Sequence, residues 1–394
     1  RGYDHESHLW EVSSLVTIAV GPLLRTAVPA SGLKDHVIAL NVGNIVTVIT
    51  RPDAFTNAEW VAARTRLADQ GFKIMLGPDV AFDAVTSTLM SGKADAAYFA
   101  SLPENIVAST DDNPFFFYTA RFGQFVGLAF SAHTNNNAAI TMTFALIMVA
   151  LAACLYYVVG PFVRLARKTP LSTLTPPVAY FCAIGIGFML IEISQMQRLM
   201  VFLGHPVYGL SVVLFTILLF GGIGSTTVGA HFPRPGPITG RIVALLATLA
   251  LAGLLTPGLT AWARSETTGM RIVLSVLLLA PPAFCMGMMF PLGLNIWRRH
   301  TELHPFFWSA NGITSMLASV MGMALSIEFG IAHTYALGVG FYGVCAAMVV
   351  VAYRTSRSSA AAVDSPSIQP TQRELIADIE AKLHESARAR QAAE

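Results

Sequence analysis

The organisation of this chain follows from residues Tyr180–Gly209, which read YFCAIGIGFMLIEISQMQRLMVFLGHPVYG. The stretch begins as an apolar run suited to crossing a bilayer, and polar side chains follow in its second half. Glu192, Gln195 and Arg198 are spaced i, i+3, i+6, so they form one slowly rotating polar track on a helix. A charge at the centre of a bilayer costs at least a few kcal/mol, so such residues usually face protein or water. We therefore expect another part of the molecule to contact this polar track.

The composition is that of a membrane protein. Of 394 residues, 54% are hydrophobic and 12% are charged, whereas soluble globular proteins carry about 25% charged residues. The net charge of +2, without a basic patch among aromatics, gives no indication of a nucleic-acid partner. The predicted partner is the lipid bilayer, and the oligomeric state stays open. We predict no metal site, since four cysteines in apolar runs lack metal-ligand spacing: Cys154, Cys182, Cys285 and Cys345.

Residues 136–353 are the predicted transmembrane helical bundle, because they hold about seven apolar runs of roughly 20 residues. Very short turns between spans two and three and between spans six and seven predict tight hairpins. Pro281-Pro282 is expected to break the fifth span, either as a kink without function or as a transporter-like binding site. The seven spans are Ala138–Gly160, Pro176–Val201, Val207–Ala230, Ile238–Leu255, Arg271–Leu294, Phe307–Phe329 and His333–Tyr353.

Residues 1–135 read as a water-soluble α/β domain. Strand, helix, strand in this order predicts the C-terminal part of a Rossmann-like fold with a partly parallel sheet. Thr56 and Glu59 form a capping box that starts the helix. No GxGxxG or P-loop follows a candidate strand, so we expect the cofactor-binding half upstream of Arg1, in a longer protein. The predicted elements are helices over His8–Thr26 and Thr56–Gln70 and strands over His36–Leu40, Ile45–Thr50 and Phe72–Leu76.

Two adjacent carboxylates, Asp111 and Asp112, precede Asn113-Pro114 and a run of phenylalanines. Adjacent carboxylates can bind a metal or an amine. Asp and Asn before Pro also favour a turn, which is the interpretation we prefer.

The polar track has candidate partners on the sixth span. Asn311 and Ser315 lie at apolar depth, where they would join spans two and six as a structural clamp to Glu192. Arg198 is a nearby neutralising partner for that carboxylate, and His205 in the following hairpin could approach Arg198. The alternative is that the track forms a ligand or ion site.

Loop charges predict the orientation of the bundle. The positive-inside rule places the C-terminal tail in the cytoplasm and residues 1–135 outside. The alternatives are that one span is miscounted or that upstream spans set the topology, so the orientation of the soluble part stays open. Residues 354–370 are Ser/Ala/Pro-rich and predict a flexible linker, and 371–394 predict an amphipathic helix. The basic residues of one side are Arg164, Arg167, Lys168, Arg234, Arg241, Arg298, Arg299, Arg354 and Arg357.

Several motifs in order resemble the C-terminal portion of bacterial membrane-integral spermidine synthase-like proteins, in which an aminopropyltransferase-type Rossmann domain is fused to membrane helices. Asp111, Asp112, Pro114, His205 and Pro206 lie in these motifs. The resemblance covers about residues 35–353 and rests on IVTVITRPDAFTNAEW (Ile45–Trp60), STDDNPFFF (Ser109–Phe117), GIGFMLIEISQMQRLMVFLGHPVYGLSVVLF (Gly185–Phe215), FGGIGS (Phe220–Ser225), MGMMFPLGL (Met286–Leu294) and WSANGITSM (Trp308–Met316).

The resemblance implies a bacterial inner (plasma) membrane protein and transferase chemistry on S-adenosylmethionine or its decarboxylated form. The glycine loop, the ribose-binding acid and the catalytic aspartate of active spermidine synthases have no counterpart in this chain. We therefore expect no cofactor here and assign no catalytic residue, so an enzymatic role stays open. Where the family pattern has Arg, this chain has Asn113, and the ion pair of that Arg is lost.

Three functions remain in view. The first is the membrane half of a spermidine synthase-like protein whose chemistry lies upstream. The second is a polyamine or small-cation transporter-like module with Glu192, Gln195, Arg198 and Asn311 as its intramembrane polar site. The third is a non-catalytic membrane anchor or interaction domain.

Overall fold

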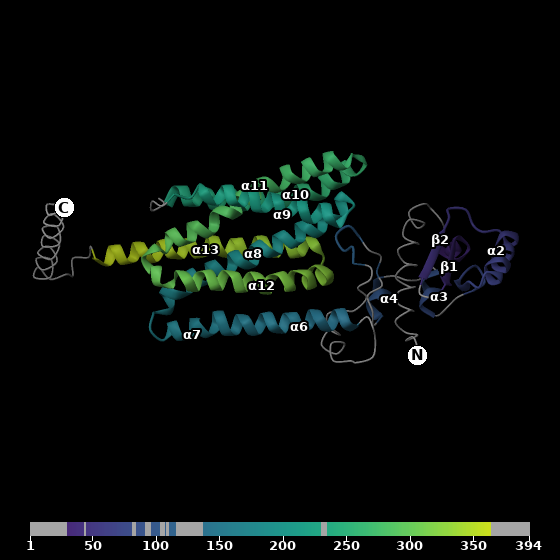
Figure 1. Ribbon diagram of the computed structural model, residues 1–394, viewed down its shortest axis with the longest axis horizontal. Helices are drawn as coiled ribbons and strands as arrows, with labels where there is room; N and C mark the ends of the chain where they lie inside the picture. The colour runs from purple at the N-terminus through teal and green to yellow at the C-terminus, as the bar shows by residue number, and fades with distance from the viewer. Residues whose placement is uncertain are drawn as a thin grey trace, which may run out of the picture.

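The computed structural model describes residues 30–42, 45–80, 84–90, 96–102, 107, 110–115, 137–229 and 235–363. In this part of the chain, a small α/β unit lies beyond one end of a long bundle of helices, and the C-terminal end of the last helix lies at the opposite end (Figure 1). The helix predicted over His8–Thr26 and the amphipathic helix over 371–394 fall outside the described residues.

The α/β unit is built on a three-stranded sheet with the order β2-β1-β3. Both hydrogen-bonded pairs are antiparallel, so the prediction of a partly parallel sheet is wrong. The predicted strand–helix–strand order is correct. In the sheet, however, β1 lies between β2 and β3, the two strands that α2 connects, so β2 and β3 do not pair with each other. This sheet does not by itself establish a Rossmann fold. The elements of the unit are η1 (Ala30–His36), β1 (Val37–Val42), β2 (Ile45–Thr50), α2 (Asn57–Asp69), β3 (Lys73–Leu76), α3 (Ala84–Met90) and α4 (Ala96–Ser101).

Helix α2 begins and ends as its sequence predicts. Thr56 Oγ1 accepts the amide of Glu59, and the Glu59 carboxylate accepts the amide of Thr56 at 2.8 Å. Gly71, at φ +79°, takes the left-handed conformation after the last turn. Trp60 packs with Ile38 and Leu40 and so fixes the helix on the sheet.

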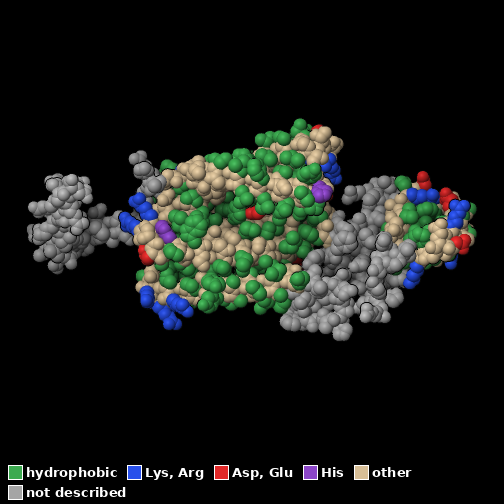
Figure 2. Space-filling model, viewed as in Figure 1, with side chains coloured by type: hydrophobic (Ala, Val, Ile, Leu, Met, Phe, Trp, Pro, Cys, Tyr) green, Lys and Arg blue, Asp and Glu red, His purple; other side chains and the backbone are tan. Residues whose placement is uncertain are grey.

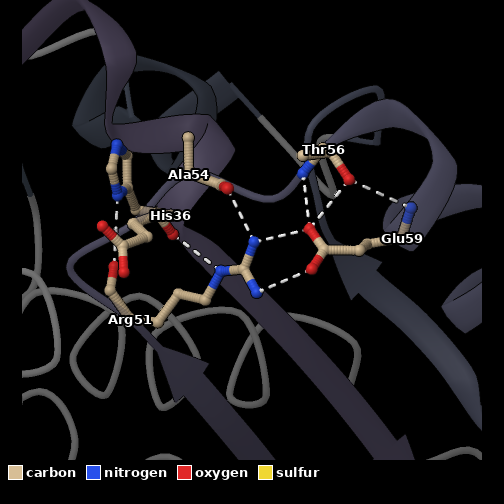
Figure 3. A network of polar contacts seen from close by, with 6 residues as sticks. His36, Arg51, Ala54, Thr56 and Glu59 are labelled. Atoms are coloured by element: carbon tan, nitrogen blue, oxygen red, sulfur yellow. Dashed lines mark hydrogen bonds and ion pairs between the residues drawn. The ribbon is translucent and has the colours of Figure 1, made fainter.

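An arginine ties the corner between β2 and α2 together (Figure 3). Arg51 Nη2 lies 2.7 Å from Glu59 Oε2 and also donates to the Ala54 carbonyl, while His36 Nδ1 donates to the Arg51 carbonyl. The hydrogen bond from Arg51, joined by those from Thr56, lowers the pKa of Glu59 to about 2. The same bond raises the pKa of Arg51.

The bundle contains seven helices that are long and apolar enough to cross a membrane, as predicted. Helix α8, at 33 residues, extends over about 50 Å and exceeds the roughly 30 Å of a bilayer core. The bundle's segments are α6 (Asn137–Cys154), the π-helical turn η3 (Leu155–Val159), α7 (Gly160–Ala166), α8 (Leu171–Leu203), α9 (Pro206–Thr226), α10 (Pro235–Trp262), η4 (Ala263–Ser265), α11 (Thr268–Ile296), η5 (Arg298–Leu303), α12 (His304–Phe329) and α13 (Ile331–Val363).

Helix α8 is the centre of the bundle. It packs against α9, α11, α12 and α13, and a larger share of its most apolar segment is buried than in any other candidate span of the described residues. Close approach is possible because glycines lie at the crossings. A Cβ atom on Gly185 would come within 2.5 Å of the Asn311 carbonyl on α12, and one on Gly187 within 3.0 Å of the Gly338 carbonyl on α13.

Both predicted hairpins are present. Gly204, at φ +75°, and Gly330, at φ +89°, make the turns that follow α8 and α12.

Two other predictions about the helices are wrong. Helix α11 continues through Pro281 and Pro282 without a break, its buried face held against α9 and α8. Helix α13 continues to Val363, so part of the predicted linker over 354–370 is helical.

The two ends of the bundle differ in charge. Exposed basic side chains gather at the end farther from the α/β unit, where Arg164, Arg167, Lys168, Arg298 and Arg299 lie (Figure 2). Along the chain, an odd number of candidate spans lies between the α/β unit and each of these basic residues, so they are at the opposite end of the bundle from the unit. The described basic residues on which the positive-inside argument rests therefore lie together at one end of the bundle.

Candidate functional site

The candidate site is the second half of α8 and the turns around its C-terminal end. The polar track of Glu192, Gln195 and Arg198 lies at positions i, i+3 and i+6 of this one helix, as predicted. Arg198 is nearest to the membrane edge, and Glu192 is about 9 Å deeper along the helix. The three side chains differ in their partners.

Arg198 pairs with Asp112. Its Nη2 lies 3.1 Å from Asp112 Oδ1, and the arginine side chain is only 12% exposed. The same carboxylate accepts the amide of Ala332 at 2.8 Å, and the Asp112 carbonyl accepts the amide of Ile331 at 2.9 Å. Asp112 therefore joins the end of α8 to the start of α13. Arg198 does not contact His205, nor is it an ion-pair partner of Glu192, so both predicted contacts are wrong.

The rest of the Asp111–Pro114 segment is the predicted turn, closed by a bridge between Thr110 and Asn113. Asp111 Oδ2 lies 2.5 Å from Arg264 Nη2, with both side chains largely exposed. Asn113 donates from Nδ2 to the Ile327 carbonyl at the end of α12. The turn thus contacts the ends of α8, α12 and α13 and the short helix η4 that follows α10, which the sequence did not predict.

A second arginine completes this end of the bundle. Arg271, near the start of α11, donates from Nη1 to the Phe202 carbonyl of α8 and from Nη2 to the Arg264 carbonyl. The sequence analysis assigned no partner to Arg264 or Arg271. Asp111 and Asp112 were the one sequence feature that could have indicated these contacts, because two adjacent carboxylates can pair with two arginines, here Arg264 and Arg198.

Glu192 has no partner among the residues that the structure describes. It is half-buried in the middle of the bundle. Asn311 donates from Nδ2 to the Phe181 carbonyl at 3.0 Å, and Ser315 donates to the Asn311 carbonyl. The predicted clamp between Glu192 and Asn311 is therefore wrong, although Asn311 does join spans two and six.

Comparison of the chain with protein-family models, curated proteins and solved structures finds no match. The site is therefore interpreted from its own geometry.

Gln195 and Gln197 are also incompletely paired. Gln195 is 1% exposed, and its side-chain amide lies beside the Tyr335 hydroxyl of α13 without a hydrogen bond of good geometry from Nε2 or Oε1 in the described part of the chain. Tyr335 donates its hydroxyl proton to the Leu249 carbonyl of α10. Gln197 contacts Met323 Sδ from Nε2, at 3.1 Å, and leaves its Oε1 unpaired.

The remaining motif residues have local roles. His205 is the N-cap of α9, where its Nδ1 accepts the amide of Val207, and Pro206 occupies the first turn of that helix. Pro114 follows the Asp111–Asn113 turn. The described residues contain no group of three or more His, Cys, Asp or Glu side chains that could hold a metal ion.

Proposed function

We propose that this chain is the membrane-integral part of a spermidine synthase-like protein, and that its helical bundle anchors a water-soluble part at one membrane face. The ordered series of sequence motifs supports the family. The contacts of the Asp111–Asn113 turn support the anchoring role, because this turn connects the soluble part to the bundle along the chain and reaches four helix ends.

The anchoring role rests chiefly on the Asp112–Arg198 pair. The pair links the turn directly to α8, the central helix of the bundle, and through Asp112 to the start of α13. A carboxylate that accepts hydrogen bonds from a guanidinium and a backbone amide is fixed in position more firmly than one with a single contact. Fixing this turn limits where the preceding soluble residues can lie.

Charge reversal tests the anchor. In the purified chain in detergent, Asp112→Arg should increase hydrogen–deuterium exchange in residues 110–115 and at Ile331 and Ala332 several-fold. Adding Arg198→Asp should restore part of the protection, because the opposite charges are again adjacent. The matched control is Asp111→Arg, which should have the smaller effect, since the Asp111–Arg264 pair is exposed. Equal exchange in all variants would contradict anchoring through this turn.

Transferase chemistry is assigned to no residue of this chain. S-adenosylmethionine and its decarboxylated form are the cofactors that the resemblance implies for the wider family. Equilibrium dialysis of the purified protein with both compounds tests the enzymatic interpretation. Failure to bind either compound would contradict an aminopropyltransferase role and leave the anchor alone.

A bacterial plasma membrane location, with the α/β unit outside the cytoplasm, is part of the same proposal. It is supported by the basic side chains at the opposite end of the bundle. Cysteine labelling from outside intact cells, at an exposed position of α2 and at Arg299, tests it. Labelling at α2 alone is the expected result.

A further inference from the structure

Three exposed basic side chains lie at the turn between α7 and α8. Arg164, Arg167 and Lys168 form no ion pair with another residue that the structure describes. The chain has no acidic residue between Asp112 and Glu192, so the segment supplies no carboxylate of its own. Arg164 lies in the last turn of α7, where the partial negative charge of the helix end offsets only part of one positive charge. The α7–α8 turn therefore carries positive charge that the described residues do not neutralise.

The arginines at the other end of the bundle have partners within the protein. Arg198 pairs with Asp112, and Arg264 pairs with Asp111. Arg271 donates to two backbone carbonyls. The contrast indicates that the basic side chains of the α7–α8 turn take their anion from outside the chain.

The neighbouring turn at the same end does not supply the missing carboxylate. In η5, Glu302 Oε1 lies 3.5 Å from His300 Nδ1. The same segment adds two exposed arginines, Arg298 and Arg299. Among the described residues, this end of the bundle thus has an excess of positive charge.

The α7–α8 turn also borders apolar side chains that are exposed. Val163 and Leu171 are exposed on either side of the basic residues, and Tyr156 and Tyr157 are exposed about 10 Å further along the helix. Exposed aromatic rings are typical of the boundary between lipid tails and headgroups. The candidate span Met142–Ala166 has 25 residues and extends over about 38 Å, which exceeds the roughly 30 Å of the hydrocarbon core. The basic turn at its end therefore lies at the level of the lipid headgroups.

We propose that the α7–α8 turn binds the headgroup of an anionic phospholipid through Arg164, Arg167 and Lys168. A guanidinium donates two parallel hydrogen bonds to phosphate oxygens, and the lysine adds a compact positive charge. The acyl chains of the lipid cover Val163 and Leu171. A soluble acidic protein fits the charges but leaves these apolar side chains uncovered, so a lipid is the better occupant. Basic clusters directly beside a membrane helix attract anionic lipids for this reason.

Thermal unfolding of the full chain in detergent micelles tests this site, which is at the opposite end of the bundle from the Asp112 anchor. Dioleoylphosphatidylglycerol should raise the unfolding temperature saturably. Dioleoylphosphatidylcholine has the same acyl chains and no net charge, and it should not. Combining Arg164→Gln, Arg167→Gln and Lys168→Gln should weaken the apparent affinity for phosphatidylglycerol at least tenfold.

The matched control removes three positive charges from exposed positions of the α/β unit. Lys34→Gln, Arg64→Gln and Arg66→Gln together change the net charge by the same amount and should leave the affinity unchanged. An equal loss of affinity in this control would overturn the proposal, because net charge alone would then decide binding.

A second variant covers the case in which the first triple variant does not fold. Arg167→Gln alone, at the exposed C-cap of α7, should weaken phosphatidylglycerol binding at least threefold. The proposal is overturned if phosphatidylcholine protects as well as phosphatidylglycerol, or if both variants bind phosphatidylglycerol as wild type does. It is also overturned if sodium phosphate or polyglutamate gives the same protection in phosphatidylcholine micelles. The site would then take a free phosphate or a soluble acidic protein.

Discussion

The two halves of α8 satisfy polar groups in different ways. In the first half, polar side chains on neighbouring helices reach the backbone of α8, as Asn311 does at the Phe181 carbonyl. In the second half, polar side chains belong to α8 itself and must find partners elsewhere. Arg198 finds Asp112 near the membrane edge, where a turn from outside the bundle can reach it. Glu192, deeper in the bundle, is beyond the reach of that turn.

The difference shows that depth decides which polar groups in this bundle are paired. At mid-depth the backbone amides and carbonyls are already used within the helices, so few acceptors or donors remain for a side chain. Near the edge, hairpin turns and helix ends leave free backbone groups. Ala332 and Ile331, just after the α12–α13 turn, supply two of these to Asp112.

The largest expected effect concerns the closely packed first half. Gly185→Ala places a methyl group within 2.5 Å of the Asn311 carbonyl and should destabilise the protein by about 1–3 kcal/mol, because α8 and α12 must separate. Gly312→Ala is the matched control, since nothing lies within 4 Å of its Cβ position and alanine favours a helix. Denaturant unfolding in mixed micelles measures both. Equal stabilities would show that the first half is not closely packed.

The next effect compares the two carboxylates at the membrane edge. Asp112→Ala should cost about 1–2 kcal/mol, because a mostly buried arginine and a backbone amide lose their acceptor. Asp111→Ala should cost about 0.5 kcal/mol or less, because Asp111 and Arg264 are both well exposed. The same unfolding assay separates them. A larger loss from Asp111→Ala would contradict the assignment of Asp112 as the main contact.

A smaller effect tests whether the two halves are independent. Asn311→Ala should cost about 0.6 kcal/mol, the average value of a hydrogen bond between helices in a membrane. Combined with Glu192→Gln, the effects on the free energy of unfolding should add to within about 0.5 kcal/mol, since the two side chains do not contact each other. A coupling above that value would restore the clamp that the structure rejects.

The smallest expected effect concerns the Arg51–Glu59 ion pair in the α/β unit. The folded-state pKa of Glu59 is about 2, below its ordinary value near 4.3, so the Arg51–Glu59 pair contributes stability above about pH 4.3. This contribution should be lost as the pH falls from about 4.3 towards 2, because protonation removes the charge. Protection factors for amides of α2 measure it, with Glu59→Gln as the variant that lacks this pH dependence. A pH-independent α2 in wild type would contradict the network of Figure 3.

Sequence patterns were sufficient for local structure. Apolar run length predicts the seven candidate spans, and the Thr56–Glu59 capping box predicts the start of α2. The short turns between spans two and three and between spans six and seven predict both hairpins. These features depend on residues close together in sequence, where period and spacing carry the information.

Partners distant in sequence were not predicted. Asp112 and Arg198 are separated by 86 positions, and nothing in either motif specifies the other. Asn311 binds a backbone carbonyl, and every residue of α8 has one, so its choice of Phe181 depends on how the two helices cross. The continuity of α11 through Pro281-Pro282 likewise depends on packing with α8 and α9.

The most direct test of this account is a pair of double-mutant cycles that share Arg198. The free energy of unfolding is measured for wild type and for the three single variants Arg198→Leu, Asp112→Asn and Glu192→Gln. It is also measured for Arg198→Leu combined with Asp112→Asn and for Arg198→Leu combined with Glu192→Gln. The account predicts a coupling energy between Asp112 and Arg198 of about 0.5–3 kcal/mol and none between Glu192 and Arg198. Coupling of Arg198 to Glu192 instead of to Asp112 would contradict it, since the polar track would then be a single internal ion pair.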